Sequence, residues 1–284
     1  MSSPQPITPP AEQAPQSGPF PDAPRVMYAR NPLVEVICQV RFPPVLKIEA
    51  LIPDAFQERI RGMFPVYRDS QPLLGNIELP PELLQLVRNT IPSGVQKGPR
   101  AFATEDEKWT VTLAKDFLAL STKEYTRWDD FWHYLKPALD ALQAVYMPVA
   151  YTRTGLRYRD VIRRSKLELE GFDWRDLLGH ELAGELRDMQ VGERVIETTT
   201  QTLIQLPDYD AKVRLQHGTA IEDGENCYVI DHDLFTEKKT EHQNVFATLR
   251  FFNIQAHRLF RWCIQDRLHD AMQPQLLPAR DNPE

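Results

Sequence analysis

The sequence predicts an α+β fold of two approximately repeated halves, with an antiparallel sheet and helices packed on one side of it. Segments that alternate between apolar and polar residues predict the strands, and segments with apolar residues three and four apart predict the helices. The order strand, helix, several strands, helix occurs twice along the chain. Because 42% of the 284 residues are hydrophobic, the chain can build a substantial core.

The first half opens with NPLVEVICQVRF (31–42), which alternates as a strand does. IPDAFQERIRGMFP (52–65) has the apolar spacing of a helix, whereas PELLQLVRNTI (81–91) fits either a helix or a strand. Residues 105–125 alternate on both sides of a polar break, which predicts a hairpin. A helix with an apolar stripe follows over 128–142, and Thr126 is expected to cap it.

The second half repeats this order. A strand is expected at 150–163 and a short helix at 174–186, followed by three strands. These strands are ERVIETTTQTLIQL, AKVRLQHGTAI and NCYVIDHDLF, and the last two are joined by the turn sequence EDGEN. A long final helix begins near residue 245, where Thr240 and Gln243 are the expected caps.

Composition sets the boundaries of these parts. Residues 1–30 are rich in proline and poor in bulky aliphatic residues, so they are predicted to be a disordered leader. The first α+β half is assigned to 31–148 and the second to 149–273. Residues 274–284 are expected to be a flexible C-terminal tail.

Charge, cysteines and missing motifs exclude several classes of function. No secretory signal or membrane span is visible, and three separated cysteines fit buried thiols, so a cytoplasmic protein without a membrane partner is expected. A net charge of -7 argues against nucleic acid as a partner. None of the common catalytic, phosphate-binding or metal-binding motifs occurs, so we expect no catalytic residue, no metal and no cofactor.

Positive charge gathers in RTGLRYRDVIRRSK (153–166), in which six of fourteen residues are basic. As a strand, this stretch places Arg153, Arg157, Arg159 and Arg163 on one face and Leu156, Tyr158 and Ile162 on the other. In IDHDLF, Asp231 and Asp233 share one face, and His232 lies on the opposite face. The polar sides of the first, middle and late strands are therefore predicted to form one uncovered sheet surface.

The candidate binding residues on this surface are Glu35, Arg41, Arg153, Arg157, Arg159, Asp231 and Asp233. One interpretation is mutual neutralisation, in which the arginines pair with acids on adjacent strands. The other is that the arginine row receives an acidic partner or ligand, because guanidinium groups suit carboxylates and phosphates.

The ordered set PLVEVICQVRF, RTGLRYRDVI and IDHDLF, with a final helix ending in LFRWCIQDRL, resembles a sporadically distributed family of uncharacterised bacterial proteins. Members show PLVEV-type, RxGLRY-type and DxDxF-type strands in this order. The resemblance covers roughly residues 31–272. It implies a bacterial, intracellular protein, and it implies no activity.

These observations favour a non-enzymatic interaction or accessory protein that binds a protein partner through the polar sheet face or the leader. One alternative is a sensor for a small anionic ligand, with a cleft between the two halves. Another is a metal-dependent hydrolase that uses Asp231 and Asp233, since two carboxylates on one face can hold a divalent cation.

Overall fold

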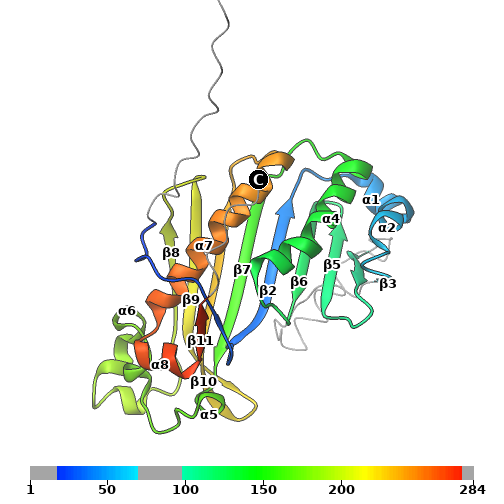
Figure 1. Cartoon of the computed structure of the whole chain (residues 1–284). Coiled ribbons are helices and arrows are strands. Elements are labelled where there is room, and N and C mark those ends of the chain that lie inside the picture. Colours follow the sequence, from blue (N-terminus) through cyan, green and yellow to red (C-terminus); the bar gives the residue numbers. More distant parts are fainter. Residues whose placement is uncertain (1–17, 70–97, 277–284) are drawn as a thin grey trace, which may run out of the picture.

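The structure, a computed structural model, describes residues 18–69 and 98–276 and has the predicted α+β class. A nine-stranded antiparallel sheet carries two long helices along one face (Figure 1). The segment 81–91 and residues 1–17 lie outside the described residues.

The sheet is continuous across both halves. Its order is β3-β4-β5-β6-β2-β7-β10-β9-β8, and every neighbouring pair is antiparallel. In each half the first strand pairs with the last, and the two first strands, β2 and β7, pair with each other at the centre. The strands are β2 (Leu33–Arg41), β3 (Val66–Asp69), β4 (Arg100–Ala103), β5 (Trp109–Ala114), β6 (Phe117–Thr122), β7 (Arg153–Ile162), β8 (Thr199–Gln205), β9 (Ala211–Glu222) and β10 (Glu225–Thr236).

The long helices α4 and α7 close the two halves. α4 contacts β6, whereas α7 contacts β7 and β10, so each helix covers strands of its own half (Figure 1). The helices are α1 (Leu46–Ala50), α2 (Asp54–Ile60), α4 (Trp128–Tyr146), α5 (Arg164–Leu167), α6 (His180–Ala183), α7 (Val245–Cys263) and α8 (Asp266–Ala271).

Two details of the predicted helices are wrong. The caps of α4 and α7 are Arg127 and Asn244, and neither makes a side-chain capping bond, so the predicted caps Thr126, Thr240 and Gln243 are wrong. The helix predicted at 174–186 is broken into α6 and two 3-10 turns. The break lies at Gly179, whose ψ of 150° is not helical, and its lack of a Cβ atom allows close approach to the carbonyl oxygen of Trp262, which a Cβ would meet at 2.6 Å.

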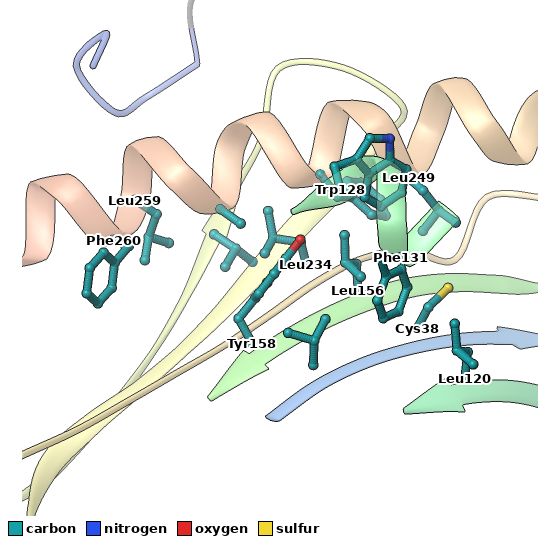
Figure 2. Packing of buried hydrophobic residues seen from close by; sticks show 14 of the residues in the cluster. Cys38, Leu120, Trp128, Phe131, Leu156, Tyr158, Leu234, Leu249, Leu259 and Phe260 are labelled. Carbon is teal, nitrogen blue, oxygen red and sulfur yellow. The ribbon is translucent and has the colours of Figure 1, made fainter. Parts of the chain in front are cut away.

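The core lies between the sheet and the long helices. Alternate side chains of β2 and β7, including Cys38, Leu156 and Tyr158, are buried on this face. Figure 2 shows these side chains pointing from the strands toward Leu249 and Leu259 of α7. Pairing β2 with β7 therefore merges the apolar faces of both halves into one core.

The fold extends beyond both predicted ends. Strand β1 (Val26–Tyr28) pairs with β11 (Pro274–Leu276), so parts of the predicted leader and tail form a small two-stranded sheet. Phe20 is buried, with its ring centroid 5.6 Å from that of Trp262 on α7. A single aromatic residue in a proline-rich segment thus anchors residues that composition alone assigns to a disordered leader.

Phe20→Ala is expected to lower the free energy of unfolding by about 3 kcal/mol, because it leaves a cavity beside Trp262. The matched control is Leu276→Ala, which changes an exposed residue of the same small sheet and should cost less than about 0.5 kcal/mol. Urea unfolding of both variants measures the difference. Equal, small losses would show that the segment around Phe20 does not pack.

Candidate binding sites on the two faces of the sheet

The predicted polar residues share the face of the sheet opposite the long helices, which we call the open face. The register brings them together, since Arg159 lies beside Glu35 on one side and beside Asp231 on the other. Arg157 lies directly opposite Asp233 on β10. The prediction that three polar strand faces form one surface is therefore correct in geometry.

The acids on the open face hold the arginines in diagonal ion pairs. Arg153 Nη2 lies 2.7 Å from Asp233 Oδ2. Arg157 donates two hydrogen bonds to Asp231, one of them from Nε to Oδ1 at 2.8 Å, and this bonding raises the pKa of the Arg157 guanidinium. Both acids lie on β10 and both arginines on β7, so the pairs connect neighbouring strands.

A second group of charges forms at the far end of β7. Glu222 accepts hydrogen bonds from Arg159 at 2.6 Å and from Arg163 at 2.8 Å. Glu35 and Arg41 lie on the same face but form no ion pair with a described residue. These ion pairs favour the first interpretation, in which the arginines are neutralised by acids on adjacent strands, over the second, in which the arginines bind an external anion.

A depression of about 510 Å³ lies on the open face. Three predicted residues line it, namely Arg157, Arg159 and Asp231. The exposed Ile196 and Ile221 also line it, and they add apolar surface to a charged floor. Glu35, Arg41, Arg153 and Asp233 are not part of this depression.

The geometry gives no support to a metal site on this face. Asp231 and Asp233 are both engaged by guanidinium groups. Across residues 18–69 and 98–276, no group of three or more acids, histidines or cysteines is arranged to hold a metal ion.

A second cavity, of about 280 Å³, lies on the helix side of the sheet, between α7 and the start of α4. Residues 25–28 of the N-terminal segment form another part of its wall, and β7 and β10 contribute side chains from the sheet. Its lining combines aromatic rings with polar groups. These residues are Tyr28, Tyr125, Trp128, Tyr158 and Phe260, with Arg25, Asp160, His232, Asn253 and His257.

Asp160, His232 and Asn253 are the buried polar residues of this cavity, at 5%, 2% and 5% exposure. Asp160 Oδ2 lies 4.0 Å from His232 Nδ1, which has no hydrogen-bond partner among the described residues. Burial raises the pKa of Asp160 well above its ordinary value and lowers that of His232 to about 4. Burial therefore favours the neutral form of each group.

A hydrogen-bonded chain borders the same cavity. Arg25 Nη2 donates to Asn253 Oδ1 at 2.6 Å, and Asn253 Nδ2 donates to the hydroxyls of Tyr158 at 2.8 Å and Tyr125 at 3.2 Å. Figure 2 shows the Tyr158 hydroxyl at the end of the side chain that approaches α7. The chain fixes the N-terminal segment to α7 and to the sheet.

No pattern in the sequence predicted this cavity. The sequence feature that could have indicated it is Asp160, a carboxylate on the same strand face as the apolar residues Leu156, Tyr158 and Ile162. His232 was correctly placed opposite Asp231 and Asp233, but nothing in the sequence pairs it with Asp160. Strands β7 and β10 bring the two groups together from positions 72 residues apart in the numbering, which local periodicity does not reveal.

No family model and no curated protein matches this chain. The resemblance to a bacterial family therefore stays a prediction. None of the helices in the described part of the chain is both long and apolar enough to cross a membrane.

A double-mutant cycle on Arg153 and Asp233 is expected to give a coupling free energy of about 1 kcal/mol or more, because both side chains are only one-fifth exposed. The matched control is the pair Lys136 and Asp140 on α4, which is about half exposed and should give less than about 0.5 kcal/mol. Urea unfolding of the alanine variants measures both. Equal coupling in the two pairs would contradict the ordered ion pairs of the open face.

The pH dependence of stability tests the Asp160 environment. Folding raises the Asp160 pKa above 3.8, so the folded chain binds this proton more tightly and stability falls as pH rises. Folding lowers the His232 pKa from 6.5 to about 4, so that group makes stability rise with pH between those values. Above pH 6.5, His232 is neutral in both the folded and the unfolded chain and no longer makes stability depend on pH. Of the two groups, only Asp160 still does so, until it ionises in the folded protein.

Asp160→Asn should therefore lessen the fall in unfolding free energy that ionisation of Asp160 in the unfolded chain causes as the pH rises above 3.8, and should raise stability at the upper end of the range measured. Asp116→Asn, at the turn between β5 and β6, is the control and should leave that slope unchanged. Chemical denaturation at several pH values supplies the slopes. Identical slopes in wild type and Asp160→Asn would contradict the buried, unpaired carboxyl.

Proposed function

We propose that this protein is a non-enzymatic accessory protein of the bacterial cytoplasm that binds a protein partner on the open face of its sheet. The observation that carries the proposal is an ordered surface of charged side chains on a sheet face that lies opposite both long helices. The charges lie beside an apolar-edged depression, and this combination is typical of protein interfaces, which are rich in arginine and mixed in polarity.

The ion pairs support a protein partner over a small anion. Each arginine of the row already has an acidic neighbour, so a free anion would have to displace a carboxylate. A protein surface of alternating charge can instead add bonds to the oxygens and nitrogens that the pairs leave free. Because the side chains are held before binding, less conformational entropy is lost on docking.

Two other predicted functions receive less support. A hydrolase that uses Asp231 and Asp233 would need carboxylates that are free to bind a metal, and here arginines engage both. A cavity does lie between parts of the two halves, but it is on the helix side and contains none of the arginines of the open face. The leader residues 1–17, the other predicted docking element, lie outside the described residues.

The open face is tested by site-specific photo-crosslinking in cells of the native organism. A photoreactive residue at Gln216, which lines the depression, should trap a discrete protein adduct. The same residue at Lys136, exposed on α4 in the helix layer, is the control position and should not trap that protein. Mass spectrometry identifies the adduct.

A charge swap then tests whether the ion pairs themselves are recognised. Arg153→Asp combined with Asp233→Arg keeps an internal pair but reverses its pattern, so the adduct from Gln216 should fall at least about tenfold while the melting temperature is kept. The swap Lys136→Asp with Asp140→Lys is the matched control and should leave the adduct unchanged. Equal adducts from both positions, or none from Gln216, would overturn the proposal.

A further inference from the structure

We propose that the helix-side cavity binds a small primary amine, with its ammonium group at Asp160 and His232 and its apolar body against the aromatic wall. This site lies on the opposite side of the sheet from the open face and does not depend on the function proposed for that face.

The missing partner of Asp160 is the first argument for a cation. No arginine or lysine of the described chain pairs with Asp160, and His232 Nδ1 at 4.0 Å is beyond hydrogen-bond distance. Open-face acids such as Asp231 and Asp233, by contrast, are engaged by arginines. A buried carboxylate without a positive partner is costly, and an ammonium group supplies both the charge and the donors.

The number of acceptors fits an ammonium group, which has three N–H donors. Asp160 supplies carboxylate oxygens, and the unpartnered His232 Nδ1 accepts a bond when the imidazole proton is on Nε2. The Tyr158 hydroxyl oxygen accepts one bond from Asn253 and has a second lone pair, whereas the Tyr125 hydroxyl oxygen accepts bonds from both Asn253 and the Tyr158 hydroxyl. An ammonium group can thus satisfy polar atoms that the protein leaves without partners.

The walls favour the same class of ligand. Five aromatic side chains line the cavity, and the electron-rich faces of such rings attract cations. These rings are Tyr28, Tyr125, Trp128, Tyr158 and Phe260. The rings also provide apolar surface for the rest of the molecule, so an amine with an aromatic or aliphatic body fits the lining.

The size of the cavity limits the ligand. Its volume of about 280 Å³ equals that of roughly nine water molecules at about 30 Å³ each, which corresponds to a ligand of about ten non-hydrogen atoms. A nucleotide or a peptide is too large for this space.

Arg25, Arg127 and His257 also line the cavity and make an anion the competing occupant, although Arg127 is paired with Asp130 at 3.0 Å. The Arg25 guanidinium is anchored to Asn253 Oδ1, and His257 Nε2 lies 2.8 Å from the carbonyl oxygen of Pro24. Both groups therefore have polar partners, whereas Asp160 has none at hydrogen-bond distance among the described residues. The group that lacks a hydrogen-bond partner is therefore the acidic one.

Amine binding should release a proton. The titratable groups within electrostatic reach of Asp160 are His232 on β10, Tyr28 on the N-terminal segment, Cys263 on α7 and Asp231 on the opposite face. The cationic Arg25 and Arg127 line the same cavity but form no ion pair with Asp160, and burial lowers the pKa of His232, which favours its neutral form. A bound ammonium favours the ionised carboxylate, so affinity should rise with pH until Asp160 ionises in the free protein.

The test uses three probes of nearly equal shape, phenethylamine, 2-phenylethanol and phenylacetate, with the full-length protein. Isothermal titration and thermal shift should detect phenethylamine at least about tenfold more tightly than either of the others. Titration in two buffers of different ionisation enthalpy should show proton release with phenethylamine. Tighter binding of phenylacetate than of phenethylamine would overturn the proposal and indicate an anion site at Arg25. Equal binding of 2-phenylethanol and phenethylamine would also overturn it, because the cavity would then recognise only the apolar part of the ligand.

Variants separate the site from the fold. Asp160→Asn should weaken phenethylamine binding by at least about thirtyfold and abolish proton release. Asp116→Asn, at the turn between β5 and β6, is the control and should retain both. Ala256→Leu fills the cavity from α7 and should block binding with the melting temperature nearly unchanged, which tests the site even if Asp160→Asn does not fold. Absence of phenethylamine binding to the wild type, or undiminished binding to Asp160→Asn, would overturn the proposal.

Discussion

The pairing of β2 with β7 is the interaction on which the rest of the structure depends. These are the first strands of the two halves, and their antiparallel register joins two sheets into one. Each half alone would leave an edge strand with unpaired backbone groups and a partly covered apolar face. Joining them at the centre satisfies both edges and brings α4 and α7 onto the same face, where they share a single core.

This arrangement also creates two different environments for polar side chains. On the open face, charges remain accessible, and arginines on β7 meet acids on β10. On the helix face, the same two strands place Asp160 and His232 below α7, where water is largely excluded. The N-terminal segment adds the remaining wall because Phe20 and β1 hold it against α7 and β11.

The strands and the open face could be predicted because their signals are local. Period-two alternation gives the face of each side chain, and the turn at Asp223 and Gly224 has the positive φ angles that its residue types favour. Strand order could not be predicted in the same way, because β2 and β7 pair across more than one hundred intervening residues. The ordered part of the leader was missed because one buried ring, Phe20, outweighs a disorder-prone composition.

Arg159 and Asp160 are adjacent in the chain, but their side chains lie in these two different environments. Arg159 points to the open face and bonds to Glu222, whereas the next side chain points into the helix-side cavity. A one-residue slip of β7 against its neighbours would exchange them and bury the arginines, so the apolar positions Leu156, Tyr158 and Ile162 fix the register. The same constraint forces Asp160 into the core side. An apolar residue at this position would pack without the free-energy cost of burying an ionisable group. The carboxylate of Asp160, which breaks the apolar pattern of the strand, therefore lowers stability at the position where we propose a binding site.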